Sequence, residues 1–439
     1  MRGPTSRCAD AGFRMMVARG VDAKWLLAAF LGCGAALNYA DRAAMSAVLA
    51  SVRSEMGLSD VALGLLGSVF LWSYAVGSLL AGRLADRRSR RGLVLWSVAG
   101  WSAVTALMGL ASNYSTLVTL RFLLGLTESL FLPAAFALVA ETHGMGTRAR
   151  AMSLITIGIN AGMVIGGGFT GTMAEHYGWR SGFWVLGFAG IALALVGRAF
   201  VPVSTANAVV ETSGTSFWTT LRFLAAVRSY RVLLLESILS GFGMWMFFAW
   251  LPLYLRETYN MTLGTAGFAG TLVLQGAVVL GIATGGWLSD RVSAAAPHRR
   301  MLLYGVFYLL GAPFLLIFLG RPEFPILAIG IAAFSFLRGM GQANDNPTQC
   351  EVVPRQYRAT GLGVMNAIST AAGGAGVLLA GFLKRELGLG AVFASVAGIF
   401  ALAGVALIVG YRFWLQEDIQ RARQIEMAVA GGDSGVAPR

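Results

Sequence analysis

Four ionisable residues lie within long apolar stretches, and their types suit the binding of an anion and a proton. Asp41 and Arg42 end the run Asn38-Tyr-Ala-Asp-Arg, and Arg121 and Glu128 lie seven residues apart. Seven residues are two helical turns, so Arg121 and Glu128 share one face of a helix. A charge at the centre of a membrane-spanning helix costs at least ~2.5–3.5 kcal/mol on insertion scales, so these side chains should face a partner or a wet cavity.

The chemistry of these four side chains predicts a coupled site. A guanidinium binds a carboxylate through two parallel hydrogen bonds and stays charged at every relevant pH. Arg42 is therefore the predicted ligand of a substrate carboxylate, with Arg121 beside it. Burial disfavours the ionised form of a carboxyl group, so Glu128 is the predicted proton carrier. Asp41 either carries a second proton or holds Arg42. The alternative is a structural salt-bridge network that fixes two helices together.

A second set of polar residues lies in later apolar stretches. Arg338 and Asp345 repeat the seven-residue spacing of the first set. Arg338 is a predicted substrate contact, whereas Asp345 lies near the end of its stretch, which favours a helix cap or a gate. Isolated polar or aromatic residues are further substrate-contact candidates, with packing between helices as the alternative: Tyr39, Tyr74, Asn160, Gln275 and Asn366.

The elements that position these residues must be membrane-spanning helices. Apolar residues make up 56% of the chain, charged residues only 13%, and the mean hydropathy is +0.67. Soluble domains carry about 25% charged residues. A span needs roughly 20 mostly apolar residues, and open sheets cannot satisfy their backbone in lipid. Twelve spans are predicted, near 25–50, 61–81, 92–112, 116–140, 151–174, 180–202, 231–255, 264–288, 301–320, 325–350, 359–383 and 389–414.

The net charge of +13 follows from the loops. Most of the 34 basic residues fall in the N-terminal segment, the even-to-odd loops and the C-terminal tail. The positive-inside rule therefore predicts that both termini are cytoplasmic, in a bacterial inner membrane. A nucleic-acid-binding protein would instead gather its charge on one folded face, so no nucleic-acid partner is expected. The loops predicted on the other side of the membrane carry only six basic residues: Arg53, Arg180, Arg256, Arg321, Lys384 and Arg385.

The chain divides in the middle, and each half carries a similar motif. Gly82-Arg-Leu-Ala-Asp86-Arg87 precedes the third predicted span, and Gly286-Trp-Leu-Ser-Asp290-Arg291 precedes the ninth. A motif at the same place in each half indicates a duplicated six-helix unit. The predicted divisions are a cytoplasmic tail, a first bundle, a cytoplasmic central loop, a second bundle and a second tail, at residues 1–23, 24–202, 203–230, 231–415 and 416–439.

Other chemistries have no motif in this sequence. The three cysteines form no Cys-x-x-Cys pair, and the three histidines have no metal-ligand spacing. A P-loop or a catalytic triad is likewise missing, so we expect no metal, no cofactor and no enzymatic activity. The polar, basic first 23 residues lead into a full predicted span, which is not the pattern of a cleavable signal peptide.

The motif Gly82-x-x-x-Asp86-Arg87-x-x-Arg90-Arg91 resembles the signature of the major facilitator superfamily. Ser89 stands where that family usually has glycine. The resemblance implies two pseudo-symmetric six-helix bundles, with the first and fourth spans lining a central cavity. It also implies that the motif is a gate latch, formed by Gly82, Asp86, Arg87 and Arg90 in the first half and by Asp290 and Arg291 in the second.

Four further stretches look like the anion:cation symporter branch of that superfamily: Asn38–Arg42, Arg121–Glu128, Gly178–Phe183 and Trp250–Leu255. This likeness implies proton-coupled uptake of a small organic anion, such as a sugar acid or an aromatic carboxylate, by a monomer in the lipid bilayer. The run Asn344-Asp-Asn-Pro is not typical of the branch. Export of a metabolite, drug or lipid by the same fold stays open, as does sodium coupling, and a non-transporting sensor or scaffold is the third hypothesis. Gly166-Gly167 stands where drug:proton antiporters usually have Gly-Pro.

Overall fold

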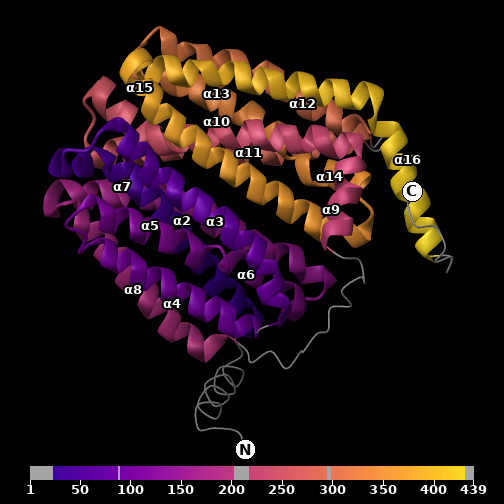
Figure 1. Cartoon of the computed structure of the whole chain (residues 1–439), viewed down its shortest axis with the longest axis horizontal. Coiled ribbons are helices and arrows are strands. Elements are labelled where there is room, and N and C mark those ends of the chain that lie inside the picture. Colours follow the sequence, from indigo (N-terminus) through magenta and orange to yellow (C-terminus); the bar gives the residue numbers. More distant parts are fainter. Residues whose placement is uncertain (1–22, 88, 202–216, 294–297, 431–439) are drawn as a thin grey trace, which may run out of the picture. The chain divides into compact units, whose positions relative to one another are not determined.

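The computed structural model describes residues 23–87, 89–201, 217–293 and 298–430, and every regular element in these ranges is a helix (Figure 1). In the first half the helices are α2 (Ala23–Met56), α3 (Asp60–Arg87), α4 (Arg90–Met108), α5 (Tyr114–Glu128), α6 (Phe131–Thr142), α7 (Met145–Tyr177) and α8 (Trp179–Phe200). In the second half they are α9 (Phe217–Ala226), α10 (Arg228–Tyr259), α11 (Leu263–Ser293), α12 (Arg299–Gly311), the 3-10 helix η1 (Ala312–Leu319), α13 (Phe324–Gln342), α14 (Asp345–Val352), α15 (Arg355–Phe413) and α16 (Leu415–Ala430).

Ten stretches of the described residues are long and apolar enough to cross a membrane. The first helix, α2, is not among the ten; it carries Asp41 and Arg42 near its middle. The 59-residue α15 is counted as one stretch, although Gly388 interrupts its helical backbone at φ 73°. Such a left-handed conformation is one that glycine adopts without steric cost, and it falls between the two spans predicted to end at 383 and begin at 389.

Several predicted spans differ from the observed helices. The predicted span 116–140 is broken between α5 and α6, and the predicted span 325–350 is broken between α13 and α14. Two helices also lie where the sequence predicts a loop and a tail, because their apolar residues recur at helical spacing. Thr220, Phe223 and Leu224 are the buried positions of α9, and Leu415, Ile419 and Ala422 are among those of α16.

Unit 1 comprises residues 1–210, 248–271 and 377–382, and it includes the ends of α10 and α11. Within it α2 packs on α7, α4 on α8 and α3 on α5 (Figure 1). The contact between α2 and α7 is made by backbone, because a Cβ added to Gly158, Gly162 or Gly166 would overlap main-chain atoms of Gly32, Ala36 or Ala40. Small residues four apart allow such close helix packing.

Unit 2 comprises residues 211–247, 272–376 and 383–439. Its core is aromatic: the rings of Phe247 and Phe393 stack with centroids 4.5 Å apart, and Phe318 and Phe334 pack against the same ring of Phe247. In this unit α12 packs on α13 and α14, and α14 packs on α16. These contacts hold the ends of α12, α13 and α14 together, which matters for the polar cluster described below.

Candidate functional site

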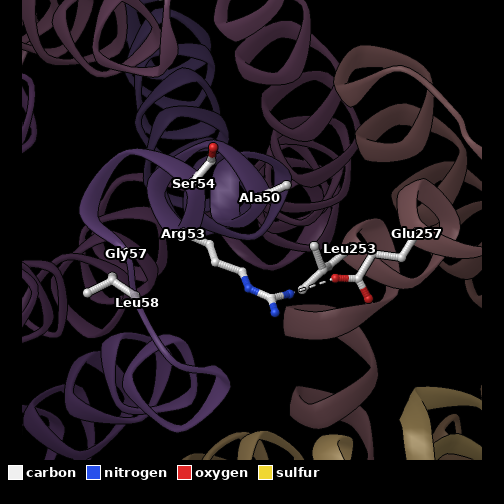
Figure 2. A pocket seen from close by; sticks show the side chains of 7 residues that line it. All are labelled: Ala50, Arg53, Ser54, Gly57, Leu58, Leu253 and Glu257. Atoms are coloured by element: carbon white, nitrogen blue, oxygen red, sulfur yellow. Dashed lines mark hydrogen bonds and ion pairs between the residues drawn. The ribbon is translucent and has the colours of Figure 1, made fainter.

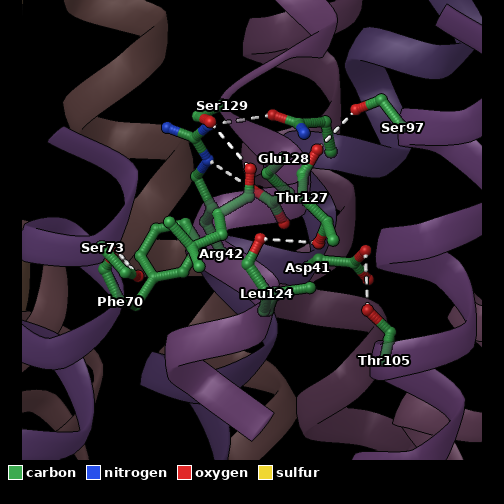
Figure 3. A network of polar contacts seen from close by, with 12 residues as sticks. Asp41, Arg42, Phe70, Ser73, Ser97, Thr105, Leu124, Thr127, Glu128 and Ser129 are labelled. Carbon is green, nitrogen blue, oxygen red and sulfur yellow. Dashed lines mark hydrogen bonds and ion pairs between the residues drawn. The ribbon is translucent and has the colours of Figure 1, made fainter. Parts of the chain in front are cut away.

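A buried ion pair joins the middle of α2 to the end of α5 in unit 1. Arg42 Nε donates to Glu128 Oε2 at 3.0 Å, and Arg42 Nη2 donates to Asn38 Oδ1 at 3.0 Å (Figure 3). Arg42 is 5% exposed and Glu128 is fully buried. A buried pair of this kind is strongly destabilised when one partner loses its charge or is removed. The structure thus places together two of the four residues that the sequence singled out.

Aromatic rings enclose the guanidinium of Arg42. Its Cζ lies 4.3 Å from the ring centroid of Tyr39, 4.3 Å from that of Tyr74 and 5.4 Å from that of Phe70. Rings at such distances attract a cation through their π electrons. Tyr39 and Tyr74, both predicted substrate contacts, therefore contact the predicted carboxylate ligand itself.

Arg121 lies apart from the ion pair, although it is 3% exposed. Its Nε donates to the backbone oxygen of Leu66 at 3.2 Å, and its Cζ lies 4.6 Å from the ring centroid of Phe70. Its Nη1 has no hydrogen-bond partner in the part of the chain that the structure describes. Glu128 is thus paired with Arg42 and not with Arg121, even though Arg121 is on its own helix.

Asp41 faces α4. Thr105 Oγ1 donates to Asp41 Oδ2 at 3.1 Å, and Asp41 is 2% exposed (Figure 3). Its other oxygen has no partner among the described residues, and neither do Glu128 Oε1 and Asn38 Nδ2. Buried polar atoms are nearly always paired in native proteins, so this concentration of unpaired donors and acceptors marks a place where a polar ligand, water or a proton would bind.

The break between α5 and α6 positions Glu128. The residue is the last of α5, and Ser129 and Leu130 separate it from α6. A Cβ on Gly125 would overlap Ser73 and the backbone of Phe70, so α5 approaches α3 closely one turn before the break. The carboxyl group is thereby held at a helix end inside the unit, close to α2.

The remaining predicted substrate contacts lie elsewhere. Asn160 of α7 donates to its own helix, at Thr156 O, 2.8 Å away, and is not part of the network. Gln275, Arg338 and Asn366 belong to unit 2. Arg338 is 8% exposed and donates to Gln342 Oε1 at 3.0 Å. Their role as substrate contacts stays a prediction.

The predicted latch is described in part. Gly82, Asp86 and Arg87 lie in α3, and their side chains are outside the described part of the structure. Arg90 of α4 forms an ion pair with Glu141 of α6.

The second copy of the motif makes related contacts in unit 2. Asp290 accepts from Arg300 Nη2 at 3.1 Å, and Arg300 Nε also lies 3.5 Å from Glu351 Oε1. Arg291 lies over the ring of Trp287, with its Cζ 3.9 Å from the centroid. Asp345 accepts from Gln349 Nε2 at 2.9 Å, as the first residue of α14. Sequence reasoning did not single out Glu141 or Glu351, although each lies about fifty residues after the basic residue that it binds.

A cavity of about 410 Å³ lies at the far end of α2 (Figure 2). Arg53 lines this cavity and forms two ion pairs, with its Nη1 3.0 Å from Glu257 Oε1 and 3.4 Å from Asp60 Oδ1. Arg53 follows Arg42 by about three helical turns, so this cavity is separate from the buried ion pair. It is lined by Ala50, Arg53, Ser54, Gly57, Leu58, Leu253 and Glu257.

Comparisons with known proteins all point to membrane transporters. The model of the Major Facilitator Superfamily matches residues 31–377 and 233–428. A probable galactarate/D-glucarate transporter of Bacillus subtilis is 28% identical over 57% of this chain, which spans 61% of that relative's length. A gallate transporter of Pseudomonas putida is 27% identical, with 84% of this chain and 87% of the relative aligned. An MFS-type efflux pump of Mycolicibacterium smegmatis is 27% identical, with 92% and 95% aligned.

A solved structure shares the fold. The bacterial homologue of the human lysosomal transporter Spinster, in an inward-facing and occupied conformation, superposes with a TM-score of 0.70. The superposition covers 92% of this chain and 97% of that one, at 19% sequence identity. At this identity the likeness concerns the fold alone.

Proposed function

Because the chain belongs to the major facilitator superfamily, we propose that it is a proton-coupled symporter that takes up a small organic anion by alternating access. The family and the relatives are transporters and not enzymes. The observation that carries the proposal is the buried pair of Arg42 and Glu128, 3.0 Å apart. An arginine whose partner is a titratable carboxyl group can exchange that partner for the carboxylate of a substrate.

The exchange couples the two ligands. While Glu128 is ionised it occupies Arg42, and a substrate carboxylate would meet both an occupied guanidinium and a like charge. When Glu128 binds a proton, Arg42 loses its counter-ion in a low-dielectric setting, and the substrate carboxylate replaces it with two hydrogen bonds. Loss of the proton restores the ion pair and expels the anion. Proton and anion thus raise each other's affinity, as linkage requires.

The surroundings of Arg42 suit an organic acid that has a carboxylate at one end. Tyr39, Tyr74 and Phe70 surround the guanidinium and give a substrate ring or carbon chain an apolar and aromatic surface. Among the described residues Arg121 Nη1 is an unpaired donor for a further hydroxyl or carboxylate oxygen, and Asp41 Oδ1 is an unpaired acceptor for a substrate hydroxyl group. Sugar acids and aromatic carboxylates both fit these needs, and the names of the relatives contain both classes.

The proposed scaffold has twelve spans in two pseudo-symmetric six-helix bundles. Counting α2 as a span, and α15 as two spans divided at Gly388, raises the ten candidate stretches to twelve. The basic loops support cytoplasmic termini in a bacterial inner membrane, with a monomer as the working unit. A reporter that is active only in the periplasm, fused to the C-terminus, should be silent, and strong signal would overturn this orientation.

The proposal is tested by uptake into proteoliposomes. Purified protein is reconstituted with an inward proton gradient, and uptake of D-glucarate, L-galactonate, gallate and 4-hydroxybenzoate is measured with and without a protonophore. At least one carboxylate should accumulate above its external concentration, and the protonophore should abolish accumulation. Uptake of none of the four, by a preparation that stays monodisperse, would contradict the proposed substrate class.

Export is the second candidate. The observation in its favour is the alignment with the efflux pump, which covers 92% of this chain. The same vesicles distinguish export from uptake. They are loaded with substrate, so that the anion gradient is directed outward. An exporter that exchanges anion for protons would then carry protons into the vesicle as the anion leaves. A symporter moves anion and proton the same way, so the sign of the pH change inside the vesicle decides.

A further inference from the structure

Unit 2 holds a second buried cluster of ionisable groups, and the proposed transport reaction does not use it. Glu236 of α10 is 1% exposed, and Tyr304 and Tyr308 of α12 are 2% exposed. Arg338 of α13 and Asp345 of α14 complete the cluster. Spacing along the sequence connects Arg338 with Asp345 but connects neither with Glu236 or with either tyrosine.

Hydroxyl groups surround the carboxyl group of Glu236. Ser237 Oγ lies 3.5 Å from Glu236 Oε2, and Tyr304, Tyr308 and Ser240 are neighbours of the same carboxyl group. The two tyrosine hydroxyls are 3.5 Å apart. A hydroxyl donates to a carboxylate and accepts from a protonated carboxyl group. Glu236 Oε1 nevertheless has no hydrogen-bond partner among the described residues, and leaving a buried carboxylate oxygen unpaired favours the protonated acid.

The charges in the cluster do not balance. Asp345 is a second acid whose charge acts on Glu236, and Arg338 is a base whose charge interacts with Glu236. Arg338 forms no ion pair within the described ranges: its Nη1 binds Gln342, and its Nε has no acceptor. From α15, the neighbouring group is the hydroxyl of Ser369, which donates to Ser237 O at 2.7 Å and does not titrate. With both acids ionised the cluster carries an uncompensated negative charge, which is costly inside a membrane protein.

One proton removes that charge, and the geometry favours Glu236 as its site. Asp345 is only partly buried, and its carboxylate already accepts the amide of Gln349 at 2.9 Å. Glu236 is more deeply buried and receives only hydroxyl groups. We propose that unit 2 contains its own proton-binding site, in which Glu236 takes one proton from water and holds it among the hydroxyls of Tyr304, Tyr308 and Ser240. That this proton also moves with the anion rests on the proposed function, whereas its binding does not.

Infrared spectroscopy of the protein in lipid films tests the site without any substrate. At neutral pH exposed carboxyl groups are ionised, so the C=O stretch of a carboxylic acid reports buried protonated groups. The wild-type film should show such a band, and Glu236→Gln should lower its intensity by the contribution of one acid. Glu417→Gln makes the same change at an exposed position of the same unit and should keep it. A band of equal intensity in wild type and Glu236→Gln would overturn the proposal, and so would its loss in Asp345→Asn alone.

A second variant tests the site even if Glu236→Gln does not fold. Tyr304→Phe keeps the acid and removes one hydroxyl from its shell, so the C=O band should persist and move to higher frequency. A band that does not move would contradict the assignment. In proteoliposomes, Glu236→Gln should lower the number of protons that enter per anion, and an unchanged ratio would mean that this proton stays bound. Should wild type transport none of the carboxylates, the proposed function fails while the infrared result still decides the proton site.

Discussion

The two buried clusters of the molecule differ in how their charges are compensated. In unit 1 two arginines face two carboxyl groups, and Arg42 and Glu128 form an ion pair at 3.0 Å. In unit 2 one arginine stands beside two carboxyl groups and pairs with neither in the described structure, and Glu236 Oε1 has no hydrogen-bond partner there. A balanced cluster can accept an anion only after one of its acids is neutralised. A cluster with an excess acid accepts a proton first.

The two clusters share one architectural feature, a helix break beside an acid. The first break follows Glu128, the last residue of α5, and the second precedes Asp345, the first residue of α14. In both halves an arginine lies two turns earlier, at Arg121 and at Arg338. Such a match is what the proposed duplication of a six-helix unit predicts, and the different partners suit the different ligands proposed for the two clusters.

The largest effect expected is that of Arg42→Lys. Lysine keeps the charge but cannot reproduce the planar two-bond contact, and loss of one hydrogen bond between charged groups costs roughly 1.5–3 kcal/mol, about 10- to 100-fold in affinity. Uptake in proteoliposomes should fall by that factor, while Arg150→Lys, at an exposed position, should stay near wild type. Near-normal uptake by Arg42→Lys would reduce Arg42 to a structural cation and remove the main difference between the clusters.

Glu128→Gln should separate exchange from accumulation. Glutamine mimics the protonated acid with little change in size, so Arg42 stays available and anion affinity should be equal or higher. The variant should still exchange labelled for unlabelled substrate, but its accumulation ratio should fall to about one because it returns no proton. Counterflow and gradient-driven uptake are measured side by side. Loss of both in a monodisperse preparation would mean that Glu128 is structural, and retention of both would move the proton to Asp41 or Glu236.

The smallest effect is expected at an exposed ion pair, which gives a reference against which the effects at the buried clusters can be compared. Hydrogen bonds from Arg180, at 2.8 Å, and from Trp179, at 2.7 Å, lower the pKa of Glu55 below its usual value. A carboxyl group whose pKa is lowered by folding stabilises the protein above its unfolded pKa of about 4.3, and this contribution disappears as pH falls through the folded value.

Glu55→Gln should therefore be less stable than wild type at pH 7, by no more than about 1 kcal/mol for an exposed pair. The difference should vanish in acid, below the folded pKa. Thermal unfolding in detergent at both pH values measures it. A difference that persists unchanged in acid would show that the carboxylate charge is not its source.

The sequence was sufficient to select the residues of the first cluster but not to pair them. Helical spacing placed Arg121 and Glu128 on one face, and their burial cost required partners. Which arginine binds Glu128 depends on where α5 ends and on how closely Gly125 lets it approach α3, and neither is visible in spacing alone. The second cluster was harder to predict, because Tyr304 and Tyr308 resemble ordinary core residues until Glu236 is placed beside them.

The fold was predictable where long apolar windows decide it and less so where short helices depend on their neighbours. The break between the last two predicted spans was located to within a few residues, at Gly388. Helix α16 was missed because its polar composition hides an apolar face that packs within unit 2, and α9 was missed because its ten residues are too few for a membrane span. The breaks at Glu128 and Asp345 were missed because both lie inside long apolar stretches, although a proline, Pro133 or Pro347, is the third residue of the helix that follows each break.

The direct backbone contact between α2 and α7 couples the positions of the two helices. Gly158, Gly162 and Gly166 bring the two backbones into direct contact, and Gly166 meets α2 at Ala40, two residues from Arg42. With no side-chain rotamers between the helices to absorb a displacement, a tilt of α7 is transmitted to α2 almost undiminished. A tilt of α7 would therefore move the Arg42 guanidinium, although the hydrogen bonds and ring contacts described for Arg42 are made with α2, α3 and α5.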